Sequence, residues 1–229
     1  MCIRDSMGLI VKLHTGFVDR ELAEDIYSAE VDIASQEMVG DAKTIEKIFG
    51  FKKTPDDYLE TFINLKSAGL KYIAPHIAVG LDYGIVKGEI KALKMLEQIE
   101  PSTVSIIVFR PTKGTEMETV APPSCEDLAT VIKKAKQIHR RTPVILGMMR
   151  PRDNPETDSW MGRRIALEKA AVDAGVDGVE RPHPATLGYL FYSGFDVLKL
   201  PACGVLPRDY EERIKPVVLH PGEYVAMWE

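Results

Sequence analysis

The sequence predicts an α/β fold built from (βα)-barrel-type repeats, with parallel strands arranged as a partial barrel. β-prone apolar runs alternate strictly with helical patterns along the chain, and this alternation is typical of a parallel sheet. A similar phrase recurs where a helix gives way to a strand, at residues 28–32, 67–71 and 173–177. With about six such units and no GxGxxG dinucleotide fingerprint, a barrel is favoured over a doubly wound sheet.

Composition excludes several classes of partner. The chain has 229 residues, of which 45% are hydrophobic, enough for one large α/β domain or two small ones. Its net charge of −5 argues against nucleic acid or an anionic membrane as the main partner. No apolar run approaches the ~20 residues of a membrane-spanning helix. The three cysteines do not form a disulfide framework, so we expect a cytoplasmic, reducing location.

The two ends of the chain are treated separately from the barrel. Residues 1–6 resemble a translated sequencing adapter, so they are left out of the fold and Cys2 carries no meaning. Residues 7–200 are expected to form the partial barrel. Residues 201–229 form a C-terminal tail, spotted with proline and without periodicity.

Local signals place each element of the first half. Apolar runs predict strands at residues 9–14 and 31–35, and Asp19 and Asp41 are suitable N-caps for helices over residues 20–28 and 42–49. Thr54 and Pro55 open the next helix, because proline is tolerated at the first helical position, and Gly69 ends it.

Residues 71–84 form the central strand and turn. The first half is apolar and β-prone, while Gly80 and Gly84 allow tight turns and the close approach of a ligand to the main chain. A helix over about residues 88–99 and a β-rich strand over residues 103–109 follow. Residues 110–117 then form a loop with basic residues.

The second half repeats the same unit. Ser124 caps a helix that runs to about Arg140. Strands are expected at residues 143–147, 176–180 and 195–200, helices at 163–174 and 184–193, and a polar loop at 153–161. The adjacent Met148 and Met149 are interpreted as core filling.

Polar residues gather at the carboxyl ends of the expected strands, where barrels of this type carry their sites. This pattern predicts a small-molecule site at one rim. The residues are His14, Gln36 with Glu37, His76 to Asp82, Arg110 with Lys113, Arg150 with Arg152, and Glu180 with Arg181.

The order of four segments resembles the later part of radical S-adenosylmethionine enzymes, closest to biotin synthase and the biotin and thiamin synthesis group. The first is the helix-to-strand passage at residues 57–71. The second is Ile-Ala-Val-Gly-Leu at residues 77–81, which resembles the family's turn beside the cofactor. The third is Lys-Gly-Thr-Glu-Met at residues 113–117. The fourth is residues 144–150, in which Arg150 follows a strand.

The resemblance implies S-adenosylmethionine bound across the strand ends and a [4Fe–4S] cluster that would generate a 5′-deoxyadenosyl radical. It also implies a small-molecule substrate and an electron donor such as ferredoxin or flavodoxin, with a homodimer left open. The cofactor-binding residues that it suggests are His76, Ile77, Val79, Gly80, Glu37, Arg110 and Lys113. The substrate-binding residues are His14, Arg150 and Arg152.

Individual roles follow from charge. Arg110 and Lys113 would hold the cofactor's carboxylate, and Glu37 its amino group or ribose. Arg110 and Lys113 could instead be solvent-exposed loop residues without a ligand. His76 could instead be a packed histidine that hydrogen-bonds one backbone group.

The family's CxxxCxxC motif, which ligates the cluster, is absent from this sequence. Cys125 and Cys203 lie far apart, and neither is in the context of that motif. We therefore expect a fragment that lacks the first one or two βα units and is inactive alone. The family's first turn glycine is replaced by Ile77, and its acidic residue by Tyr83.

Three other functions are left open. One is a sulfur insertion of the lipoyl-synthase type. Another is an unrelated barrel lyase or synthase that binds a phosphorylated substrate, with Lys12 or Lys113 catalytic and a glycine-rich phosphate loop of which Gly178 or Gly204 gives a hint. The third is a binding module without catalysis.

Overall fold

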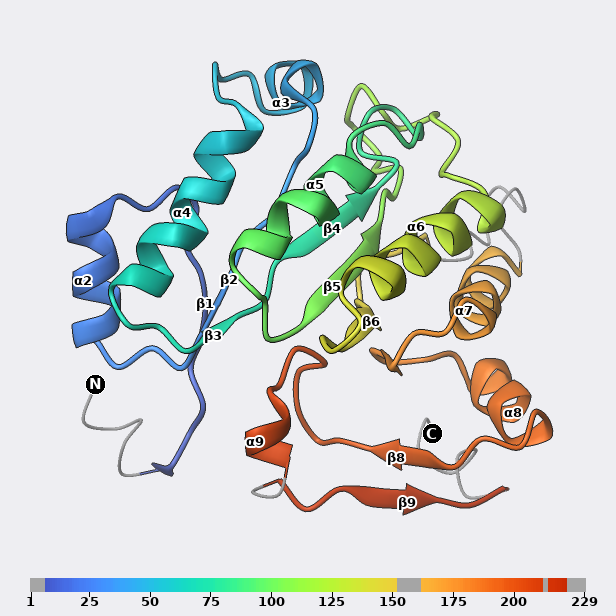
Figure 1. Ribbon diagram of the computed structural model, residues 1–229. Helices are drawn as coiled ribbons and strands as arrows, with labels where there is room; N and C mark the ends of the chain where they lie inside the picture. Colours follow the sequence, from blue (N-terminus) through green and yellow to red (C-terminus); the bar gives the residue numbers. More distant parts are fainter. Residues whose placement is uncertain (1–6, 152–161, 212–213, 222–229) are drawn as a thin grey trace.

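The structure is a computed structural model, and it describes residues 7–151, 162–211 and 214–221. Strands and helices alternate as predicted (Figure 1). The strands are β1 (Lys12–His14), β2 (Ile33–Ser35), β3 (Tyr72–Ile73), β4 (His76–Val79), β5 (Val104–Val108), β6 (Val144–Leu146), β7 (Gly178–Val179), β8 (Val197–Lys199) and β9 (Val217–Leu219). The helices are α2 (Arg20–Ser28), α3 (Ala42–Phe49), α4 (Pro55–Ser67), α5 (Glu89–Met95), the 3-10 helix η1 (Leu96–Gln98), α6 (Cys125–Ile138), α7 (Arg163–Asp173), α8 (Pro184–Tyr192) and α9 (Arg208–Glu211).

Strands β1 to β7 run parallel, in the sequence order expected of successive βα units. One sheet has the order β1-β2-β3 and the other β4-β5-β6-β7. A parallel bridge between Glu37 and His76 joins the two. In the described residues the sheet does not close, and β1 and β7 are its edges. The predicted fold class, a parallel α/β fold forming part of a barrel, is confirmed.

The two faces of the sheet are covered by different parts of the chain. Ala34, Ile73, Ile77, Val79 and Ile106 belong to the large core cluster that the helices cover, and Figure 1 shows α4, α5 and α6 lying across that face. Successive strand residues point to opposite faces, so the residues between these point to the inner face.

Short polar caps start the helices where the sequence predicts. Asp41 accepts a hydrogen bond from the Thr44 N–H. Thr54 and Ser124 each form a capping box with an aspartate at the third helical position. These caps fix the direction in which each helix leaves the rim of the sheet.

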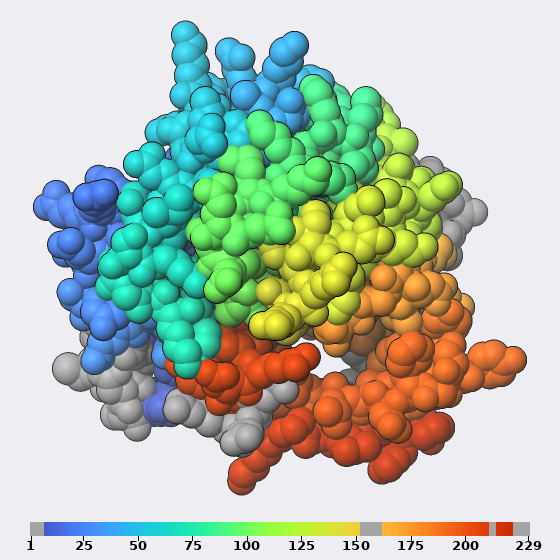
Figure 2. Space-filling model, in the orientation of Figure 1, coloured from blue at the N-terminus to red at the C-terminus, as the bar shows by residue number. Residues whose placement is uncertain are grey.

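The C-terminal part differs from the prediction. β8 does not extend the parallel sheet: it pairs antiparallel with β9, and the tail that lacked periodicity contains α9 and β9. Lys71 and Tyr72 donate hydrogen bonds to Asp209, 2.7 Å each, which attaches α9 at the start of β3. Figure 2 shows this red segment in contact with the cyan and green elements.

Two other sequence interpretations concern loops. Met148 and Met149 do not fill the core, because they lie beyond β6 and are 48% and 60% exposed. The polar loop expected at residues 153–161 lies outside the described residues. No described helix has the length and apolar content needed to cross a membrane.

Candidate functional site

A cavity of about 460 Å³ opens at the carboxyl ends of β4 and β5. We call it the strand-end cavity. β4 contributes Ala78, the turn after it Leu81 and Tyr83, and the end of β5 Ile107 to Arg110. The remaining lining residues are Glu37, Lys47 to Phe49, Thr112, Thr115 to Met117, and Met149. The site therefore lies on the rim that the sequence predicts.

The turn after β4 is held by contacts within the chain. Gly80 has φ +77°, and a Cβ there would lie 2.8 Å from Pro123. Its N–H donates to Glu89 Oε1 at 2.8 Å. The close approach that this glycine permits is therefore to the segment before α6, and Gly80 itself, a predicted cofactor contact, does not line the cavity.

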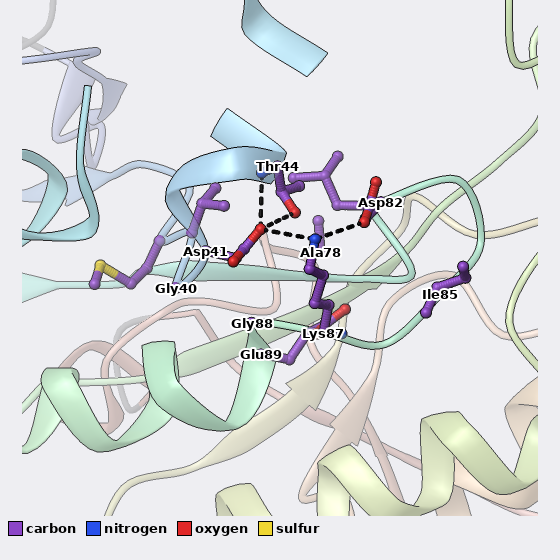
Figure 3. A pocket seen from close by; sticks show the side chains of 12 residues that line it. Gly40, Asp41, Thr44, Ala78, Asp82, Ile85, Lys87, Gly88 and Glu89 are labelled. Carbon is purple, nitrogen blue, oxygen red and sulfur yellow. Dashed lines mark hydrogen bonds and ion pairs between the residues drawn. The ribbon is translucent and has the colours of Figure 1, made fainter. Parts of the chain in front are cut away.

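A network of charges holds the same turn from the other side (Figure 3). Asp82 accepts hydrogen bonds from Lys47 at 2.9 Å and from Lys87 at 3.2 Å. Lys87 also contacts Asp41, 3.2 Å away, at the start of α3. The hydrogen bond from Lys47 outweighs burial and keeps the pKa of Asp82 below its usual value. Figure 3 shows Asp41, Asp82 and Lys87 converging between the start of α3 and the turn.

Lys47 also lies over the ring of Tyr83, 3.8 Å from its centroid. Tyr83 adopts φ +52°, a conformation that side chains other than glycine rarely adopt. Its hydroxyl donates to Glu116 at 3.3 Å. These contacts position an aromatic ring at the mouth of the cavity.

Three charged side chains in the lining have no ion-pair partner among the described residues. One, Glu116, accepts a hydrogen bond from Tyr83, and the other two have opposite charges. They are the carboxylate of Glu37 and the guanidinium of Arg110, which enter the cavity from different strand ends. Phe109 and Met149 add apolar surface. The cavity thus offers an acceptor on Glu37, a planar donor on Arg110 and an apolar and aromatic wall, which suits a zwitterion attached to a flat ring.

His14 and His76 meet on the inner face below this cavity. Their rings stack with centroids 4.9 Å apart. Burial, with the charge of Lys12 nearby, lowers the pKa of His76 to about 3, so the ring is neutral at pH 7. Burial also lowers the pKa of His14.

Arg150 does not face the cavity. Its guanidinium donates to Glu168 at 2.9 Å, to the Gly147 carbonyl at 2.6 Å and to the Glu180 carbonyl at 2.7 Å. The side chain of Arg150 is 2% exposed. Arg150 follows β6 as predicted, but it cross-links β6, α7 and β7, so we do not include it among the substrate contacts.

The other predicted site residues are divided between several places. Ile77 and Val79 are 0% exposed and pack in the core beneath the helices, so only their backbone could meet a ligand. Lys113 is exposed on the loop after β5 and does not line the cavity. Arg152 lies outside the described residues.

Sequence reasoning missed Lys47, Phe109 and Met149 as site residues. The position of Lys47 on α3 was a usable signal, because α3 is the helix that follows β2 along the chain. Phe109 and Met149 look like ordinary core residues in the sequence.

Cysteines are too few and too scattered to hold a cluster in this part of the chain. Cys125 is half-buried at the start of α6, and Cys203 is exposed after β8. Among the described residues no group of three or more His, Cys, Asp or Glu side chains could hold a metal ion.

Solved structures share this fold at low sequence identity. The maturase of the [FeFe]-hydrogenase, HydG, matches 74% of this chain with a TM-score of 0.56 and 16% identity. Methylornithine synthase matches 85% of the chain with a TM-score of 0.58 and 12% identity. Hydroxymethylglutaryl-CoA lyase from Pseudomonas aeruginosa matches 76% with a TM-score of 0.53 and 12% identity.

This chain covers 37%, 60% and 53% of the length of those three proteins. At such identities the likeness establishes the fold alone. No protein-family model and no curated protein sequence matches the chain.

Proposed function

We propose that this chain is part of a radical S-adenosylmethionine enzyme of the biotin-synthase-like type, and that the strand-end cavity binds the cofactor. Two solved structures with a similar fold, HydG and methylornithine synthase, are radical S-adenosylmethionine enzymes. In that class the cofactor supplies a 5′-deoxyadenosyl radical that abstracts hydrogen from an unactivated carbon. The full enzyme would take its electrons from a donor such as ferredoxin or flavodoxin.

One observation carries the proposal. The two short segments whose sequences resemble the family, residues 77–81 and 113–117, come together at one cavity. Ala78 and Leu81 line it from the first segment, and Thr115 to Met117 from the second. The segments are far apart in sequence, and only the packing of β4 beside β5 brings them together.

The residues present fit S-adenosylmethionine. The cavity volume of about 460 Å³ falls within the ~300–1,000 Å³ of small-molecule sites. Glu37 would take the ammonium group, Arg110 the carboxylate, and Tyr83 with Phe109 the adenine ring. Among the described residues neither Glu37 nor Arg110 has an ion-pair partner, while the third unpaired charge of the lining, Glu116, accepts a hydrogen bond from Tyr83.

The residues present do not fit the [4Fe–4S] cluster. Three thiolates must converge on such a cluster. The described residues offer two cysteines, Cys125 at the start of α6 and Cys203 after β8. No step is therefore assigned to a cluster in this chain. The contribution of these residues is to bind and orient the cofactor.

Equilibrium dialysis of the purified chain against labelled S-adenosylmethionine tests the proposal. We expect saturable binding, weakened by about tenfold or more in Arg110→Gln and in Glu37→Gln, because each loses a charged hydrogen bond. Arg140→Gln, an exposed arginine at the far end of α6, is the matched control and should bind as the unmodified chain does. Absence of binding, or equal weakening in all three variants, would reject the cofactor site.

A barrel lyase or synthase is the second candidate, and Lys12 is the observation that favours it. Lys12 is half-buried on β1, and no described carboxylate lies within ion-pair distance of its ammonium group. Borohydride trapping with pyruvate would reveal a Schiff base if Lys12 were catalytic. A phosphate loop at Gly204 is disfavoured, because the Gly204 N–H already donates to the Glu180 carboxylate at 2.7 Å.

A further inference from the structure

The inner face of the sheet carries a group of polar side chains that the strand-end cavity does not use. The strand register pairs His14 with Ser35 and His76 with Ser105. The stacked rings of His14 and His76 bring the two pairs together. Lys12 lies two residues before His14 on β1. We call these five residues the polar layer.

The polar layer lies between an apolar floor and the cavity. The floor is a separate buried cluster on the inner face, formed by Ile33, Tyr72, Ala74, Ile145 and Val205. On the other side, Ala78 and Ile107 line the cavity, and they follow His76 and Ser105 by two residues on the same face. On β4 and β5 the polar layer is therefore the next set of inner-face side chains beneath those that line the cavity.

Three buried atoms of this layer have no hydrogen-bond partner. They are Ser35 Oγ, Ser105 Oγ and His76 Nδ1, and their residues are 0%, 1% and 8% exposed. Nearly all buried polar groups in native proteins are paired. Three unpaired atoms on one face therefore indicate a partner that is not part of the chain.

A glycine leaves room beside the layer. A Cβ on Gly147 would lie 2.8 Å from Ser105 Oγ, so any larger residue there would press on this hydroxyl. Gly147 follows β6, next to Ser105 on β5. The glycine therefore avoids a clash with the Ser105 hydroxyl, which is itself buried.

The charge of the layer suits an anion. The ammonium group of Lys12 has the thiol of Cys203, 3.7 Å away, as its nearest partner, and no described carboxylate pairs with it. Hydroxyl groups donate hydrogen bonds, and a neutral imidazole donates from one nitrogen. One positive charge with three such groups matches a carboxylate, whereas a phosphate dianion commonly needs more cations.

We propose that the polar layer binds the carboxylate group of a small organic acid, with Lys12 supplying the positive charge and Ser35, Ser105 and His76 the hydrogen bonds. The exposed ring of His14 covers His76 and turns aside when the acid enters. None of the five residues lines the strand-end cavity, so this inference stands whether or not that cavity binds S-adenosylmethionine.

Calorimetric titration of the purified chain with acetate, succinate and inorganic phosphate tests the proposal, with NMR observation of the histidine side chains. We expect saturable binding of at least one carboxylate, with shifts of the His14 and His76 signals. Lys12→Met should weaken binding by about tenfold or more, because the charged partner is lost. Lys91→Met, an exposed lysine on α5, should leave binding unchanged.

Ser105→Ala separates binding from folding. The Ser105 hydroxyl has no partner in the fold, so its removal should leave the unfolding midpoint unchanged or higher while carboxylate binding weakens. Three results would overturn the proposal: no carboxylate binds, phosphate alone binds, or Lys12→Met binds as well as Lys91→Met. A lower unfolding midpoint in Ser105→Ala would also overturn it, since the hydroxyl would then serve the fold.

Discussion

Arg150 and Glu168 form an ion pair inside the fold, with 2.7 Å between Nη2 and Oε1 and side chains that are 2% and 0% exposed. The same carboxylate accepts hydrogen bonds from the His183 N–H at 2.7 Å and the Thr186 hydroxyl at 2.6 Å. Burial alone would raise the pKa of Glu168, but Arg150 and these hydrogen bonds hold it below its usual value. The pair joins the end of β6 to α7 and α8.

Glu168→Gln should therefore destabilise the chain by about 3–5 kcal/mol, because it leaves the guanidinium buried without its counter-charge. Urea unfolding followed by circular dichroism measures the loss. Lys53→Met is the control: the Lys53–Asp57 pair has the similar distance of 2.9 Å, but its side chains are 41% and 30% exposed, and pairs in contact with solvent contribute about 0.2–1 kcal/mol. If the two variants lost equal stability, the buried pair would not be the cross-link described above.

Alanine substitutions at Gly84 and Gly114 can distinguish the stability cost of backbone strain from that of steric crowding. Both glycines have φ +81°, so the strain is the same at the two positions. A Cβ on Gly84 would lie 2.1 Å from the Ala121 carbonyl oxygen, while a Cβ on Gly114 would meet nothing within 4 Å. Gly114→Ala should cost about 1–2 kcal/mol for the left-handed conformation alone. Gly84→Ala should cost a further ~1–3 kcal/mol for overpacking. Thermal unfolding of both variants checks this, and equal losses would contradict the tight contact.

Local chemistry made much of the fold predictable from the sequence. Asp41, Thr54 and Ser124 cap helices through side-chain bonds to a backbone N–H three residues later, so their effect is visible in a short stretch. The parallel sheet followed from the alternation of elements. The pairing of β8 with β9 was not predictable in this way, because it depends on a contact across the tail.

The candidate site was predictable only in outline. The cavity lies at the rim that the sequence indicated, and Glu37 and Arg110 line it, while their roles in binding stay predictions. The direction of a side chain was harder to infer: His76 and Ile77 are neighbours on β4, yet one faces the inner layer and the other the helices. The orientation of Arg150 depended on Glu168, whose partnership no short-range pattern encodes.

Iron content offers a test of the ligand set. Because the chain has three cysteines and the two described ones lie apart, anaerobic reconstitution with iron and sulfide should give no stoichiometric [4Fe–4S] cluster. The double variant Cys125→Ser with Cys203→Ser should show the same background iron and no difference in visible absorption. Stoichiometric cluster iron in the chain, lost in the double variant, would contradict this expectation.

The pH dependence of stability should reveal the buried His76. Its pKa is lowered by burial to about 3 from 6.5, so between these values the unfolded chain binds a proton that the folded chain does not. Acid therefore favours unfolding, and the free energy of unfolding should fall by about 1.4 kcal/mol for each pH unit below 6.5. His14 and His139, whose pKa values burial also lowers, act in the same direction.

Urea unfolding at a series of pH values from about 6.5 to 4.5 measures this slope, above the range in which Asp57, with its pKa of about 2, titrates in the folded chain. His76→Gln cannot take up the proton, so its stability should fall less steeply with acid over the same range. A slope unchanged in His76→Gln would mean that His76 is protonated in the folded protein, and it would place a positive charge in the polar layer beside Lys12.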